Sequence, residues 1–301
     1  MISSTPSPVP GDTPRAGELV PTGTEPLAPR YSAQLFRPLL AELLTLLRQL
    51  APDGWERLTV AGTWRVRDVA AHLLDGDLRK LAACRDGYRL PVDGPLETER
   101  DLARFINGLN ASGVAFAARL SPRLLADLLE IAGGWVADLV TGLPPHAPSV
   151  FPVSWAGEAV SENWMDTGRE YTERWHHQAQ IRDGVGAPGL LAPAWMEPLL
   201  DFSVRALPHA YAAMGAPAGT CVVLEVHGET AGAWSVVRND RRWQILRGRP
   251  AEPDAVVRVA TDDAWRLFYN ALPRADVRGR VEVTGTEALA EPLLRARSVI
   301  V

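Results

Sequence analysis

Three side chains in this sequence have the types and the spacing needed to hold a divalent cation. Glu173 and His177 lie four residues apart within residues 170–182, and a helix there would place a carboxylate and an imidazole on one face. A third donor, His72, lies in residues 64–74, which also show a helical pattern. Two histidines and one glutamate leave part of the coordination sphere open, as in catalytic zinc sites. We therefore predict a catalytic metal site, with zinc as the expected ion.

Each of these residues also has an ordinary structural interpretation. His72 could be a hydrogen-bonded core residue, and Glu173 with His177 could be a solvated pair that stabilises its helix by about 0.2–0.5 kcal/mol. His176 is an alternative ligand, because it follows Glu173 at the spacing found in di-iron carboxylate bundles. Such bundles need a second copy of this motif, which the sequence lacks. The same stretch offers polar groups that could orient the ligands or form a solvated face: Arg169, Glu170 and Gln180.

Motifs of other enzyme classes are absent or out of place. The sequence contains no GxSxG, no Walker motif and no HExxH. One GxGxxG match, residues 184–189, follows a predicted helix and includes Pro188, so we interpret it as a helix end rather than a dinucleotide-binding turn. Gly133 and Gly134 are expected to allow close helix packing, and most of the ten tryptophans to fill the core.

Other titratable residues carry weaker signals. We expect His146 and His209 to be structural or exposed, and His227, at a predicted strand end, to pack between domains. Arg182, about one helical turn beyond the predicted ligands, and Arg238, in the C-terminal part, are candidates for anchoring an anionic substrate. The pattern assigns no catalytic role beyond metal binding.

Composition indicates an ordinary globular protein. The chain has 301 residues, of which 47% are hydrophobic and 22% charged, so two domains can form without disulfides. The net charge of −5 and the scattered arginines give no basic stripe for nucleic acid, and no apolar run is long enough to cross a bilayer. The two cysteines, Cys84 and Cys221, are expected to be reduced and buried. We expect a cytoplasmic monomer or homodimer that binds small molecules rather than nucleic acid or membrane.

Hydrophobic periodicity divides the chain into three parts. Residues 1–30 contain seven of the 25 prolines and predict a disordered tail without a secretory signal. Helical periods then predict an up-down bundle, with helices at residues 31–50, 65–88, 97–120, 121–142, 161–184 and 194–214. Short segments rich in Val and Trp predict strands at residues 220–227, 233–238, 242–246, 254–259 and 277–283, with helices at 261–269 and 287–297. The predicted fold is mainly α with α+β: a bundle over residues 31–216 and a small α+β domain over 217–301.

These stretches resemble a known family. The residues that carry the resemblance are Trp64, Val66, Asp68, Val69, His72, Leu73 and Leu74, followed by Glu173, His177, Ile181 and Arg182. They resemble the mycothiol-dependent maleylpyruvate isomerase family, within the DinB-like metal-binding bundle superfamily. Residues 254–257, 265–268 and 283–285 are similar to the sterol-carrier-like domain that members of this family typically carry. The resemblance covers residues 31–301.

The resemblance implies an activity as well as a fold. It places the family's metal ligands on His72, Glu173 and His177, usually with zinc, although the adjacent His176 leaves the third ligand open by one residue. It implies mycothiol or another small thiol as cosubstrate, activated by the metal for S-transfer to, or cis-trans isomerisation of, a small electrophile. Two alternatives stay open: a non-enzymatic protein whose sterol-carrier-like domain holds an apolar ligand, and a metal-dependent hydrolase that uses no thiol.

Overall fold

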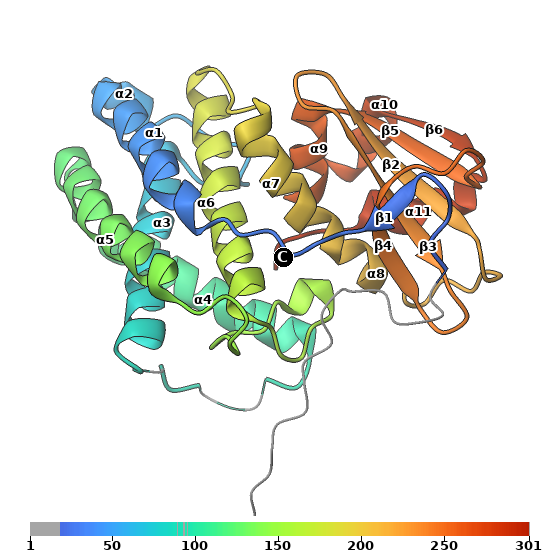
Figure 1. The fold of residues 1–301 in the computed structure, drawn as a ribbon. Coiled ribbons are helices and arrows are strands. Elements are labelled where there is room, and N and C mark those ends of the chain that lie inside the picture. The colour runs from blue at the N-terminus through green and yellow to red at the C-terminus, as the bar shows by residue number, and fades with distance from the viewer. Residues whose placement is uncertain (1–18, 89, 93, 95, 301) are drawn as a thin grey trace, which may run out of the picture.

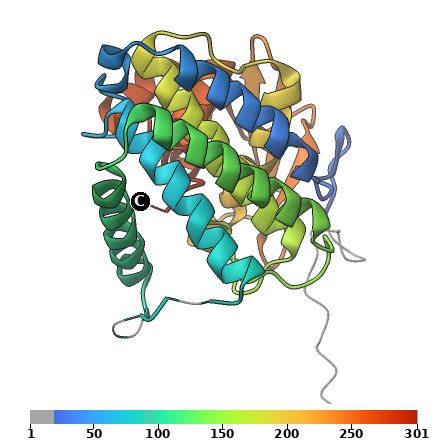
Figure 2. The same cartoon turned by 90° about the vertical axis from the view of Figure 1, so that its left-hand side faces the viewer.

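Four helices form the bundle that carries the predicted ligands. The computed structural model describes residues 19–88, 90–92, 94 and 96–300. α1 (Phe36–Gln49), α3 (Val66–Lys80), α5 (Pro122–Gly142) and α6 (Asn163–Val185) pack side by side around an apolar core (Figure 1). α4 (Glu99–Ala117) lies outside this bundle along α3 (Figure 2). The predicted fold class, mainly α with α+β, is confirmed.

Local sequence signals set the ends of these helices. Ser121 caps α5, because its side-chain oxygen accepts a hydrogen bond from the backbone N–H of Leu124 at 3.3 Å. α6 ends at Gly186, whose φ of 70° is left-handed and favours glycine. The GxGxxG match is therefore a helix end, as predicted. Gly133 of α5 lies so close to α1 that a Cβ atom would be 3.0 Å from Leu40, whereas Gly134 faces open space.

Several predicted helices are shorter or interrupted. The helix predicted at 65–88 changes from α3 to a π-helical segment, η2 (Leu81–Arg85). The helix predicted at 194–214 is divided into α7 (Pro193–Ser203), η4 (Val204–Ala206) and α8 (Leu207–Ala210), next to Pro208, which has no backbone N–H to donate. Short helical segments also occur in the connections: η1 (Ala33–Leu35), α2 (Pro52–Trp55) and η3 (Ser154–Ala156). None of the described helices is both long enough and apolar enough to span a membrane.

A six-stranded mixed sheet forms the C-terminal domain. Its spatial order is β1 (Thr24–Pro26), β4 (Trp243–Gly248), β3 (Gly232–Arg238), β2 (Cys221–His227), β5 (Ala255–Ala260) and β6 (Val281–Gly285). Strands β2 and β5 run parallel, and the other neighbours are antiparallel. The helices of this domain are α9 (Thr261–Phe268), α10 (Arg274–Arg280) and α11 (Glu287–Arg295), of which α9 and α11 pack against the sheet.

Two sequence predictions need correction here. The predicted tail over residues 1–30 is wrong for its described part, because Thr24–Pro26 pair with β4 and Leu27 is only 3% exposed; residues 1–18 lie outside the described residues. The strand predicted at 277–283 begins later. Residues Arg274–Arg280 form α10, and β6 pairs with β5 from Val281 onward. The partner of Thr24–Pro26 lies far away in the sequence, at residues 246–248, whereas β6 pairs with the preceding strand.

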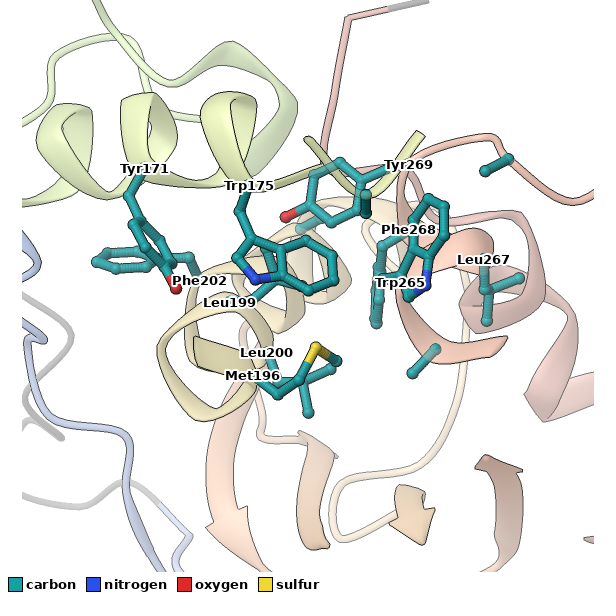
Figure 3. Packing of buried hydrophobic residues seen from close by; sticks show 14 of the residues in the cluster. Tyr171, Trp175, Met196, Leu199, Leu200, Phe202, Trp265, Leu267, Phe268 and Tyr269 are labelled. Atoms are coloured by element: carbon teal, nitrogen blue, oxygen red, sulfur yellow. The ribbon is translucent and has the colours of Figure 1, made fainter. Parts of the chain in front are cut away.

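The two domains share one continuous apolar core. Figure 3 shows Tyr171 and Trp175 of α6, Phe202 of α7 and Phe268 of α9 packed together. Helices α6 and α7 approach closely because residue 168 is glycine; a Cβ atom there would be 1.9 Å from the Phe202 ring. This shared core packs α6, which carries two predicted ligands, against the other bundle helices and against the C-terminal domain. The domain boundary at residues 216–217 stays a prediction.

Candidate metal centre

The structure brings His72, Glu173 and His177 together between α3 and α6. Each offers one ligand atom, and the three atoms lie within 4.8 Å of one another. His177 Nε2 is 3.5 Å from Glu173 Oε2, and the ring centroids of His72 and His177 are 4.5 Å apart. The Glu173 side chain keeps 26% of its surface exposed, so the cluster is not fully sealed from solvent. His177, rather than the alternative His176, belongs to this cluster.

One observation from the structure itself supports binding of a divalent cation by these three side chains. None of the described residues hydrogen-bonds the buried His72 Nδ1, a costly arrangement for a polar atom that a bound metal would relieve. Burial and the nearby His177 hold the pKa of His72 well below 6.5, so its imidazole is neutral at physiological pH. Burial would raise the pKa of Glu173, but the closeness of His177, His176 and His72 lowers it to about 2. Neutral imidazoles and a carboxylate are the forms that bind metal.

Gln180 fixes the orientation of His177. It lies one turn further along α6 and is 4% exposed, and its Oε1 accepts a hydrogen bond from His177 Nδ1 at 2.8 Å. Because Nδ1 then carries the proton, Nε2 is left with a free electron pair on the side of Glu173. Gln180 is therefore an outer partner of the kind that orients a metal-binding histidine. It was one of the polar groups singled out in the sequence.

We expect Gln180→Ala to weaken zinc binding by about 10–100-fold, because His177 loses the acceptor that selects its tautomer. Competition with a chelator of known affinity measures the effect. Gln178→Ala is the matched control, since Gln178 is equally buried on α6 but faces Leu39 and Leu43 of α1. Equal zinc affinities for the two variants would contradict this role of Gln180.

His176 does not join the ligands but stacks beside them. Its ring centroid is 4.0 Å from that of His177 and 4.6 Å from that of Tyr269, and the Tyr269 ring is tilted by only 13° from the His176 plane. His176 Nδ1 donates a hydrogen bond to Thr172 O at 2.9 Å. Tyr269 lies just beyond α9, so the C-terminal domain reaches the rings of α6. No local sequence signal linked Tyr269 to the site.

A buried network of charges occupies the next turns of α3 and α6. Lys80 Nζ lies 2.5 Å from Asp166 Oδ2, and Arg169 and Arg174 each contact Glu170 at 2.6 Å. Burial alone would raise the pKa of Glu170, but Arg169, Lys80 and Arg174 outweigh burial and hold that pKa well below its usual range. The network contains three cations and three anions: Lys80, Arg169 and Arg174 with Asp77, Asp166 and Glu170.

The two arginines considered as substrate anchors lie away from the ligands. Arg182 follows Glu173 by about two and a half helical turns, which places it on the opposite face of α6. There it contacts Glu42 at 2.9 Å and lines a pocket of about 220 Å³ with Trp175, Trp265 and Arg266. Arg238 ends β3, within the C-terminal sheet (Figure 1). Arg79, seven residues after His72 on the same face of α3, is a cation that helps to lower the pKa of His72.

The remaining histidines, the cysteines and most tryptophans lie in structural or exposed positions. His146 is exposed and contacts Glu162 and Tyr31 at 2.9 Å each, and His209 is exposed. His227 is exposed too, so the prediction that it packs between domains is wrong. Cys221 is buried as predicted, but Cys84 is only partly buried, because it lies at the end of the bundle in η2. Most tryptophans are core residues, as expected.

Comparisons with known proteins find one matching family model and similar solved structures. Residues 36–182 match the family model described as the mycothiol maleylpyruvate isomerase N-terminal domain, a range that includes all three clustered residues. A crystal structure of the mycothiol-dependent maleylpyruvate isomerase is 14% identical, with a TM-score of 0.51. A histidine-to-alanine mutant of that enzyme is 13% identical, with a TM-score of 0.52. Both comparisons cover 84% of this chain and 91% of the other, and at such identities they show a common fold.

Two further comparisons add little. A sterol carrier protein domain 2 from Helicoverpa armigera is 16% identical over 33% of this chain and 76% of its own length, with a TM-score of 0.22. That likeness is too weak to place the C-terminal domain in a family. A search of curated proteins finds no match to this sequence.

Proposed function

We propose that the protein is a metal-dependent enzyme that uses a small thiol, because residues 36–182 match the family model of the mycothiol maleylpyruvate isomerase N-terminal domain. Its cosubstrate is mycothiol or a similar low-molecular-weight thiol. Its reaction is S-transfer to, or cis-trans isomerisation of, a small electrophilic substrate. The bundle over residues 31–216 holds the site, and the domain over residues 217–301 covers it.

One observation carries this proposal: a carboxylate and two imidazoles from α3 and α6 meet within 4.8 Å, inside the range of residues that matches the family model. His72, Glu173 and His177 would hold the ion, and two nitrogens with one oxygen are ligands that zinc accepts at catalytic sites. About a quarter of the Glu173 side chain is exposed, and we expect the thiol to approach the ion from that side. Without this cluster the proposed reaction would have no metal site in this chain.

The side chains around the cluster prepare it for such chemistry. A bound divalent metal supplies a lowered thiol pKa, and so the thiolate that acts as nucleophile. Gln180 holds the His177 proton on Nδ1, and burial keeps His72 neutral. Trp64, whose ring centroid is 5.1 Å from that of His72, covers that imidazole beside the cluster. These groups orient the ligands and limit access of water to them.

The thiolate carries out the bond changes. Its sulfur forms a bond to an electrophilic carbon of the substrate, and the electron pair of the attacked double bond moves onto the substrate. In an isomerisation the remaining single bond rotates, the electron pair returns and the sulfur leaves as thiolate. In a transfer the sulfur stays and the substrate takes up a proton. Zinc as the metal, mycothiol as the thiol, a cytoplasmic location and a monomeric or dimeric state are parts of this proposal.

Metal analysis followed by thiol titration tests the proposal. Purified protein should contain close to one divalent ion per chain. Protein loaded with Co²⁺ should change its visible spectrum when mycothiol is added, and S-methyl mycothiol, which cannot form a thiolate, should leave the spectrum unchanged. A protein that binds Co²⁺ but responds to neither compound would be a hydrolase or a binding protein instead. A protein that binds no metal would refute the proposal at its first step.

A further inference from the structure

Four aromatic rings form a continuous column from the predicted ligands to the C-terminal domain. The centroid of His72 is 4.5 Å from that of His177, which is 4.0 Å from His176, which is 4.6 Å from Tyr269. The first ring belongs to α3, the next two to α6, and the last to the residue that follows α9. The column thus crosses from one domain to the other.

The distal end of the column is held firmly. Tyr269 is 3% exposed and His176 is 2% exposed. The Tyr269 hydroxyl lies 2.7 Å from Ser203 Oγ, and Ser203 Oγ donates its own proton to Leu199 O at 2.7 Å. Because the serine proton is used there, the tyrosine hydroxyl is the donor in the pair. Tyr269 is therefore fixed both by its ring and by its hydroxyl.

The backbone around Tyr269 reinforces this position. Asn270 has a φ of 54°, a left-handed conformation that asparagine tolerates, and it ends α9 directly after Tyr269. Ser298, near the C-terminus, donates from its backbone N–H to Phe268 O at 2.9 Å and from its hydroxyl to Ser203 O at 2.7 Å. Figure 3 shows Tyr269 lying against α6, beside Trp175. The docking of the C-terminal domain thus decides where the Tyr269 ring lies.

We propose that Tyr269 is a positioning residue through which the C-terminal domain holds His176, and with it His177, in place for metal binding. Stacked aromatic rings prefer a narrow range of distances and offsets, so a fixed Tyr269 restricts the His176 ring. His176 in turn contacts the His177 ring, with 4.0 Å between the ring centroids. The metal centre is then completed by domain docking, although all three ligands belong to the bundle. This inference rests on the metal site of the proposed function, but not on the thiol reaction.

Cobalt binding to full-length variants tests this inference. Tyr269→Leu removes the stacking ring and should weaken Co²⁺ binding by about 10–100-fold, the range for outer groups that orient a metal ligand. It should also shift the visible Co²⁺ spectrum, which reports ligand geometry and which a general loss of stability would not move. Tyr269→Phe keeps the ring but loses the hydroxyl bond to Ser203, so both effects should be clearly smaller than in Tyr269→Leu. Circular dichroism confirms that each variant is folded at the assay temperature.

Tyr211 offers a matched control. It is fully buried, its hydroxyl donates to Leu289 O at 2.6 Å and its ring packs 4.8 Å from that of Trp243, so it resembles Tyr269 in all but its distance from the ligands. Tyr211→Leu should lower stability and leave Co²⁺ affinity unchanged. If Tyr269→Leu does not fold, Tyr269→Met answers the same question with a more adaptable side chain. Wild-type affinity and spectrum in a folded Tyr269 variant would overturn the inference, as would an equal loss in Tyr211→Leu. A wild-type protein that binds no Co²⁺ would instead refute the proposed function.

Discussion

We expect His72→Ala to reduce zinc affinity by more than about 100-fold, because it removes a metal ligand. Loss of a group that only orients a ligand costs at most about 100-fold. His72 is the single ligand that α3 contributes, so the variant leaves only Glu173 and His177, both on α6. Two ligands on one helix cannot complete the predicted site. Zinc content after dialysis and competition with a chelator measure the loss, and thiol-dependent activity should fall with it.

His146→Ala is the control for that experiment. His146 also lies next to a glutamate, with Nδ1 2.9 Å from Glu162 Oε2, but its side chain is 58% exposed and far from α3 in the sequence. This variant should retain full zinc content. Because His72 is partly buried, unfolding of His72→Ala must be excluded by circular dichroism before its zinc content is interpreted. A folded His72→Ala protein that binds zinc as tightly as the wild type would remove the basis of the metal site.

The parts of the structure that the sequence predicted are those with local causes. The bundle helices follow from apolar residues repeating at three and four positions, and the end of α6 follows from Gly186. Glu173 and His177 could be paired because a helix alone brings positions four apart together. Assigning His72 to the same site required two helices to pack together, which the spacing within one helix does not predict. The family resemblance supported that assignment.

The parts that the sequence missed depend on distant contacts. Thr24–Pro26 form an edge strand only because β4 lies beside them, and their proline-rich surroundings predict no strand. Tyr269 reaches the His176 ring, beside the ligands, only because the C-terminal domain docks on α6 and α7. Arg182 is a different case, since helical geometry alone places it opposite Glu173 on α6. The number of helical turns between Glu173 and Arg182 therefore argues against Arg182 as a substrate anchor. The same geometry favours Arg79, which lies on the His72 face of α3.

Lys80→Met is expected to cost about 3–5 kcal/mol of the free energy of unfolding, the range for removing one partner of a buried ion pair. The Lys80 and Asp166 side chains are 2% and 3% exposed, so the variant leaves Asp166 and Glu170 with too few cations in a poorly solvated place. Chemical denaturation followed by circular dichroism measures the cost. Arg37→Met removes an exposed pair with Asp138, whose side chains are 62% and 67% exposed, and should cost at most about 1 kcal/mol.

A second substitution separates the charge effect from the loss of packing. Asp166→Asn keeps the shape of the aspartate but removes its charge, so in the Lys80→Met background it should recover part of the lost stability. In the wild-type background the same change should destabilise, because it removes the partner of Lys80. Because Glu170 lies three residues before Glu173 on α6, zinc affinity should be measured on each variant as well. Equal costs for Lys80→Met and Arg37→Met would mean that the buried network contributes nothing beyond an ordinary surface pair.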